Sequence, residues 1–162
     1  MIDFWNPEIC QRNFAARFSA GASLWLARWD ENLAGYGWSM VGNTIEPHYC
    51  PFGANDVHLF DFLVFPEYRG RQINPSLVEH ILWRMATEGR TRAYIEVREW
   101  NQPQLNSLRR TGFLLLGVAR KVSFAGRTFV EWTSRQQGTE SKDVCVSTMI
   151  IDATKRASPI SR

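Results

Sequence analysis

Residues 63–74 read LVFPEYRGRQIN, and they connect an apolar run to an amphipathic helix. At such a junction the backbone N–H groups of the first helical turn have no partner within the helix. The helix dipole favours negative charge at the same place. Two arginines, Arg69 and Arg71, add positive charge to the turn. The stretch therefore predicts an anion site, and a phosphate-bearing ligand is the natural occupant.

The segments around this turn alternate between patterns typical of strands and of helices. Helices are predicted over 10–20, 75–89 and 103–110, and strands over 23–29, 33–41, 57–65, 91–100, 113–122 and 127–133. The helix after the turn has the clearest apolar stripe, formed by Leu77, Val78, Ile81, Leu82 and Met85. A strand–helix–strand unit implies a parallel crossover, with antiparallel ribbons at its flanks. We therefore expect an α/β (α+β) fold with a mixed, mostly antiparallel central sheet and flanking helices.

The length of 162 residues fits one domain, which we place at 1–133, followed by a polar C-terminal tail or appended element at 134–162. No apolar run is long enough to span a membrane, and the first residues lack the pattern of a secretory signal. The three cysteines are widely spaced, which suits free thiols in a reducing compartment and forms no metal-ligand pattern. We expect a cytoplasmic protein with no metal site and no membrane partner.

Positive charge is concentrated in the second half of the predicted domain. Residues 66–127 hold eleven of the 19 basic residues but only five of the 16 acidic ones. Such a distribution suits a polyanionic small molecule or a nucleic acid, although a solvated surface explains most single arginines equally well. Because no motif supports nucleic-acid binding, we do not expect a nucleic-acid partner. The sequence leaves open whether the protein forms a homodimer.

Three motifs, in their order along the chain, carry a family resemblance. Residues 64–71, VFPEYRGR, precede an apolar helix and look like a cofactor motif, and 33–38, LAGYGW, resemble the strands before it. Asn101 stands eleven residues before Gly112 and Phe113, a spacing similar to that of a second motif of the same family. Over about 22–132 the chain thus resembles the GNAT superfamily of N-acetyltransferases, which have the acyl-CoA N-acyltransferase fold.

The resemblance implies an N-acyltransferase that moves an acetyl group from acetyl-CoA to a primary amine by direct attack. The acceptor would be a small-molecule or protein amine. The residues implied to cradle the pyrophosphate through backbone N–H groups are Arg69, Gly70, Arg71, Gln72, Ile73 and Asn74. The strand residues implied to separate from their neighbour and to bind the pantetheine arm are Leu63, Val64 and Phe65.

Two further roles follow from the same resemblance. The Val64 N–H would polarise the thioester carbonyl, as a donor of an oxyanion hole does. Asn101 would contact the pantetheine arm, or would instead cap the helix that follows it.

Several residues depart from the family pattern. Gln72 and Asn74 stand where small residues are usual, and Pro75 disfavours helical geometry at Asn74. Asn74 as the helix cap and Pro75 as the first helical residue would reconcile these constraints. Leu108 stands where many members place a tyrosine that protonates the departing thiolate, which leucine cannot do. The departures keep open a second function, a non-catalytic GNAT-fold module that binds a ligand or partner.

Two carboxylates are candidates for removing the proton from the attacking amine. Asp61 interrupts an apolar strand beside the predicted thioester, although a carboxylate satisfied by an arginine or by the backbone is the simpler reading. Glu96 lies on the polar face of the adjacent predicted strand, where Arg98 is an alternative partner. Ser107 has no recognisable triad partner, so covalent catalysis is not expected.

Overall fold

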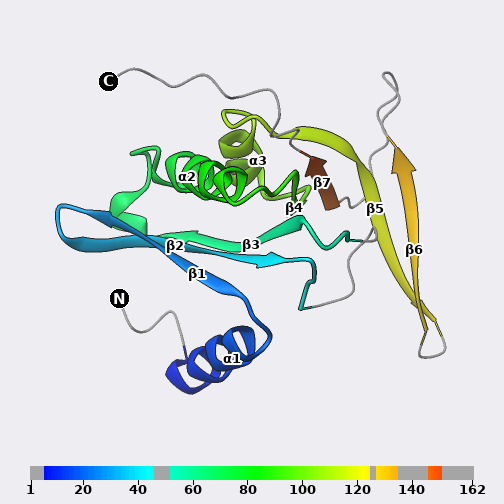
Figure 1. The fold of residues 1–162 in the computed structure, drawn as a ribbon, viewed down its shortest axis with the longest axis horizontal. Helices are drawn as coiled ribbons and strands as arrows, with labels where there is room; N and C mark the ends of the chain where they lie inside the picture. Colours follow the sequence, from blue (N-terminus) through cyan, green and yellow to red (C-terminus); the bar gives the residue numbers. More distant parts are fainter. Residues whose placement is uncertain (1–5, 46–51, 125–126, 135–145, 151–162) are drawn as a thin grey trace.

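The computed structural model describes residues 6–45, 52–124, 127–134 and 146–150, which form one sheet with helices on both of its faces (Figure 1). The helices are α1 (Pro7–Ser19), the short 3₁₀ helix η2 (Pro66–Tyr68), α2 (Ile73–Thr87) and α3 (Gln102–Leu108). The strands are β1 (Ser23–Trp29), β2 (Asn32–Val41), β3 (Asp56–Val64), β4 (Arg92–Arg98), β5 (Leu114–Phe124), β6 (Arg127–Ser134) and β7 (Val146–Ile150).

The described strands are ordered β1-β2-β3-β4-β7-β5-β6 across the sheet. Within this sheet β3 and β4 are parallel and are joined through α2, whereas the other neighbouring pairs are antiparallel. This arrangement confirms the predicted mixed, mostly antiparallel sheet with a β–α–β crossover.

Helices α1 and α2 lie on opposite faces of the sheet (Figure 1), and each covers an apolar cluster. On one face α2 buries the predicted stripe, including Val78 and Ile81, against Val57 and Leu59 of β3. On the other face α1 covers β2, where Trp38 is fully buried. No residue of α1 is itself buried. The α2 face therefore holds the main core, and α1 is a lighter cover on the far side.

Strand β7 comes from the segment 134–162, which the sequence suggested as a tail or an appended element. It lies inside the sheet, where it pairs antiparallel with both β4 and β5. Both partners are far from it in the sequence, so no local pattern could indicate this position. Apart from Ser134 and β7, residues 134–162 lie outside the described part of the chain.

Helix α2 begins earlier than predicted, and the assignment of Asn74 as its cap was wrong. The cap is Gln72, in the left-handed conformation with φ 59° and ψ 19°, and the first helical residue is Ile73. Pro75 is then the third helical residue, where a missing N–H still costs no bond within the helix. The Asn74 side chain bonds across to α3, which removes it from the capping position.

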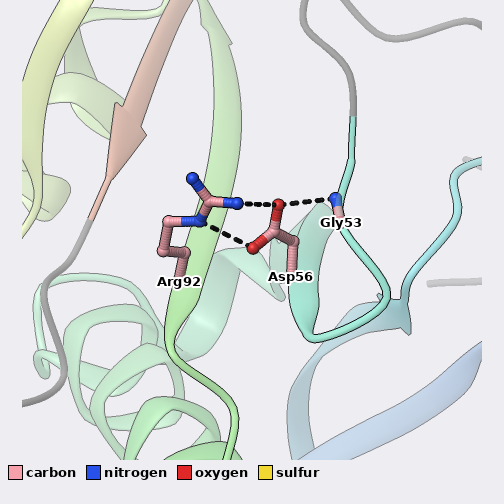
Figure 2. A network of polar contacts seen from close by, with 3 residues as sticks. All are labelled: Gly53, Asp56 and Arg92. Atoms are coloured by element: carbon pink, nitrogen blue, oxygen red, sulfur yellow. Dashed lines mark hydrogen bonds and ion pairs between the residues drawn. The ribbon is translucent and has the colours of Figure 1, made fainter.

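Strands β3 and β4 are joined at their beginnings and separate toward their ends. Their parallel pairing runs from Asp56 and Arg92 to Leu59 and Ile95. The buried Asp56 carboxylate accepts from the Arg92 Nε at 2.8 Å, from the Arg92 Nη2 at 2.9 Å and from the Gly53 N–H at 2.8 Å (Figure 2). This network fastens one end of the pair, and the later half of β3 has no partner on β4.

Candidate functional site

A bulge reorients β3 where it leaves β4. Tyr36 pairs with Leu63 but Trp38 pairs with Phe60, so β3 has an extra residue between them, and Asp61 there has a φ of 49°. The facing β2 residue is Gly37, whose Cβ, if present, would lie 2.4 Å from the Phe62 ring. Because bulges redirect side chains, the Phe62 ring can lie directly on the backbone of β2.

The end of β3, the loop before α2 and one face of α3 enclose a cleft of ≈ 510 Å³. The predicted cofactor residues that line it are Leu63, Val64, Arg69, Gly70, Gln72, Ile73, Asn74 and Asn101. Phe65 and Arg71 are not among the lining residues. The Arg71 guanidinium lies instead 5.0 Å from the ring centre of Trp29 and 6.0 Å from that of Tyr68.

The loop before α2, most of whose residues line this cleft, holds a run of backbone donors. Within the described residues, the N–H groups of residues 70–74 donate to no protein acceptor, and the first bond of the helix runs from the Ser76 N–H to the Gln72 carbonyl at 3.1 Å. Gly70 and Gln72 have positive φ values of 79° and 59°. Successive N–H groups in such turns form concave anion sites, which the dipole of α2 reinforces.

The charge of the cleft matches its backbone donors. Arg69 and Arg110 both line it, and none of its described lining residues is acidic. The Arg69 Nε donates to the Val64 carbonyl at 3.3 Å, which keeps the guanidinium beside the end of β3. A ligand with several negative charges is therefore favoured here.

The backbone of β3 also faces the cleft. The Phe65 N–H donates to the Ala34 carbonyl of β2 at 2.9 Å. Because N–H groups alternate between the two edges of a strand, the Val64 N–H is directed to the opposite edge, which has no partner on β4. At Val64 this edge of β3 therefore has no neighbouring strand, and the Val64 carbonyl on it accepts only from Arg69 among the described residues.

Helix α3 and the residues just after it contribute cleft residues to which the sequence analysis gave no cofactor role. Gln104, Ser107 and Arg110 line the cleft at intervals of three residues, and this helical spacing from Asn101 could have indicated them. Asn101 caps the helix, since its side chain accepts from the Gln104 N–H at 3.3 Å. The Asn74 Nδ2 donates to the Gln104 Oε1 at 3.0 Å and to the Ser107 Oγ at 2.8 Å. Asn74 thus fixes α2 to α3 and does not project into the anion site.

Leu108 does not face this cleft. It is 0 % exposed and packs in the main core with Phe113, whereas its neighbour Ser107 lines the cleft. In this chain, the side chain at the position where many family members have a tyrosine therefore points into the core. The hydroxyl group on the cleft side of α3 is that of Ser107.

A second cleft, of ≈ 300 Å³, opens where β3 and β4 separate. Its lining includes both candidate bases, Asp61 and Glu96, and it shares Phe62, Asn101 and Gln104 with the first cleft. The Asp61 carboxylate is 36 % exposed and forms an ion pair with Arg17 of α1. The structure thus brings both carboxylates to one place, with Asp61 held by an arginine.

One tyrosine near this cleft has a perturbed acidity. Burial raises the pKa of the Tyr36 phenol, and the negative charge of Asp61 raises it further, while Arg17 opposes the change. Tyr36 therefore stays protonated at neutral pH and is no candidate for the base.

Among the described residues, no three His, Cys, Asp or Glu side chains gather in a way that could hold a metal ion. In the same part of the chain, each helix is too short or too polar to cross a membrane.

Residues 3–113 match the family model of the acetyltransferase (GNAT) family. The fold is similar to that of yncA from Salmonella typhimurium, solved with its cofactor acetyl-CoA (TM-score 0.58, 14 % identity, 98 % of this chain and 80 % of that one). It is also similar to the ribosomal-protein-alanine N-acetyltransferase of Brucella melitensis (TM-score 0.57, 15 % identity, 91 % of this chain and 79 % of that one). A third similar structure is an N-acetyltransferase of Staphylococcus aureus Mu50 (TM-score 0.58, 12 % identity, 88 % of this chain and 74 % of that one). Among curated proteins, none matches this chain. At these identities the structural likeness establishes a shared fold.

Proposed function

This chain belongs to the acetyltransferase (GNAT) family, and we propose that it transfers an acetyl group from acetyl-CoA to a primary amine by direct attack. The observation that carries the proposal is the first cleft. It combines a run of free N–H groups and two arginines with a strand edge that has no partner. These features suit the pyrophosphate and the amide-bearing arm of acetyl-CoA, whose thioester supplies the activated acetyl group.

Each part of the cleft has a role in this proposal. The N–H groups of residues 70–74 and the Arg69 guanidinium would hold the pyrophosphate, and Arg110 would attract a further phosphate. The edge of β3 at Leu63 and Val64 would bind the pantetheine arm as an added strand does. The Val64 N–H would donate to the carbonyl oxygen as negative charge develops there.

The second cleft would admit the acceptor amine. An amine that arrives as an ammonium ion must lose a proton before it can attack. We assign that proton to a carboxylate of this cleft, Asp61 or Glu96, directly or through water. On the side of the departing thiolate, Ser107 has a hydroxyl that accepts from Asn74, so its own hydrogen can be directed toward the cleft.

A second candidate function is a GNAT-fold module that binds a ligand without catalysis. It is favoured by the orientation of Leu108, which leaves the cleft without the proton donor that many family members have. For the location of the protein we propose the cytoplasm, which the odd number of cysteines supports.

The experiment follows the release of free thiol from acetyl-CoA across a panel of primary amines, with calorimetry of acetyl-CoA binding in parallel. We expect thiol release that depends on an amine, with an equal amount of acetylated amine detected by mass spectrometry. Binding of acetyl-CoA with no release for any amine would favour the non-catalytic module. If acetyl-CoA does not bind at millimolar concentration, acetyl transfer is refuted, whereas a module that binds another ligand or a partner is not.

A further inference from the structure

The guanidinium of Arg17 lies in a site with the composition of a cation receptor. Its Cζ atom is 5.1 Å from the ring centre of Trp38, 5.6 Å from that of Phe60 and 5.9 Å from that of Phe14. An Arg17 Nη1 donates to the Asp61 carboxylate. Aromatic faces combined with a carboxylate bind ammonium and guanidinium groups in general, whether these belong to the protein or to a ligand.

This cation site opens onto the second cleft. Phe60 and Asp61 belong to both, and the second cleft joins the first at Phe62. A cationic group beside Asp61 would therefore lie next to the space proposed for the acceptor. The site is part of the acceptor side of the molecule and is separate from the anion site of the loop before α2.

Two walls of the site belong to strands of the sheet, whereas its present occupant is a side chain of the covering helix α1. Trp38 is fully buried, and its ring stacks on that of Phe60 with 6.3 Å between centroids. Both residues are paired partners in neighbouring strands of the sheet. Arg17 reaches the site on a long side chain from α1, a helix with no buried residue. The side chain can leave the site by rotation about its own bonds, and the helix and the rings can stay in place.

We propose that Trp38, Phe60 and Asp61 bind a second, non-reacting cationic group of the acceptor, and that Arg17 occupies this position in the free protein. The acceptor class is then an aliphatic diamine, with one ammonium beside Asp61 and the other amine group at the second cleft. Exchange of one cation for another leaves the Asp61 carboxylate neutralised, so for such an acceptor the base of the second cleft is Glu96. The acceptor role rests on the proposed function, whereas the cation site does not.

The binding test replaces Arg17 and adds back a small cation. Arg17→Ala is titrated with ethylguanidinium and with 1,4-diaminobutane, while the indole N–H resonance of Trp38 is followed by NMR. The matched control is Arg12→Ala, which removes the same charge from an exposed position of the same helix. We expect saturable binding to Arg17→Ala that is at least tenfold tighter than binding to wild type or to Arg12→Ala. The double variant, with Arg17→Ala and Asp61→Asn together, should lose this binding.

Equal, weak binding to all of these proteins would overturn the cation site. Should Arg17→Ala not fold, Arg17→Gln keeps the length of the side chain without its charge and is titrated in its place. Wild type gives an independent measurement, because saturating 1,4-diaminobutane must shift the Arg17 Nε–H resonance. An Arg17 resonance that does not move would also count against the proposal.

The thiol-release assay separates this inference from the proposed function. We expect wild type to have a lower KM for 1,4-diaminobutane than for butylamine, and Arg17→Ala to lower the diamine KM further. Equal KM values for the two amines would refute the diamine class and leave acetyl transfer intact. Binding of the cations to Arg17→Ala, with no acetylation of any amine, would refute acetyl transfer and leave the cation site intact.

Discussion

The substitution Gly70→Asp, compared with Gly70→Asn, isolates the charge of the anion site. Gly70 has a φ of 79°, and a Cβ built on it would have no atom within 4 Å, so neither variant creates a clash. Asn and Asp both tolerate positive φ better than other side chains, so the two variants share most of the backbone cost. They are nearly equal in size and differ in one negative charge.

The expected effect follows from Coulomb's law. An anion on the N–H groups of residues 71–74 would lie about 6 Å from a carboxylate on residue 70, the reach of one short side chain. For a pyrophosphate with about two negative charges, the repulsion is about 1.4 kcal/mol even at the dielectric constant of water. That energy raises the Kd about tenfold, and more where the cleft excludes water.

Calorimetry with acetyl-CoA measures the two Kd values at low salt and again at about 1 M salt, where the screening length falls to about 3 Å. We expect Gly70→Asp to bind about tenfold more weakly than Gly70→Asn at low salt, with most of the difference lost at high salt. S-acetylpantetheine, which lacks phosphate, should not distinguish the two variants. Equal Kd values for acetyl-CoA at low salt, or the same difference with S-acetylpantetheine, would refute the anion site.

Three further substitutions test other parts of the structure. Gly37→Ala places a methyl group against the Phe62 ring, so it should cost about 1–3 kcal/mol of stability and weaken acetyl-CoA binding. A midpoint of urea unfolding equal to that of wild type would contradict this packing of Phe62 on β2. Leu108→Tyr puts a bulky side chain into the core, so it should lower the melting temperature without increasing thiol release; faster release would mean that this position reaches the cleft. Asp56→Asn removes the negative charge of the ion pair that joins β3 to β4. Because water partly screens the half-exposed Arg92, we expect the free energy of unfolding to fall by only about 1–3 kcal/mol. The Kd for acetyl-CoA should stay within about twofold, because that network is at the opposite end of the strands from the cleft.

The sequence predicted the elements whose signals are local. The stripe of α2 and the alternation of β1 and β2 follow from periodicity, and the turn that lines the first cleft follows from one short stretch at the start of a helix. These features need no knowledge of distant partners. For that reason the strands β1 to β6 and the position of the first cleft could be anticipated, whereas the place of β7 in the sheet could not.

Features that depend on competing or distant partners could not be read from the chain. Asn74 had a plausible role as a cap, but side chains of α3 compete for the same amide. Arg71 adds charge to the loop in the sequence, yet the rings of Trp29 and Tyr68 hold its guanidinium. The rotation of a helix as short as α3, which turns Leu108 inward, is set by the core that it packs against.

The central claim is that acetyl-CoA binds along β3 and on the loop before α2. Mapping of backbone amide resonances by NMR, with and without saturating acetyl-CoA, tests it most directly. We predict that the largest shifts fall on Leu63, Val64 and residues 70–74, with smaller ones on Asn101 to Ser107 and none on β1. Shifts that cluster on α1 or β1 instead, with residues 70–74 unchanged, would contradict the account.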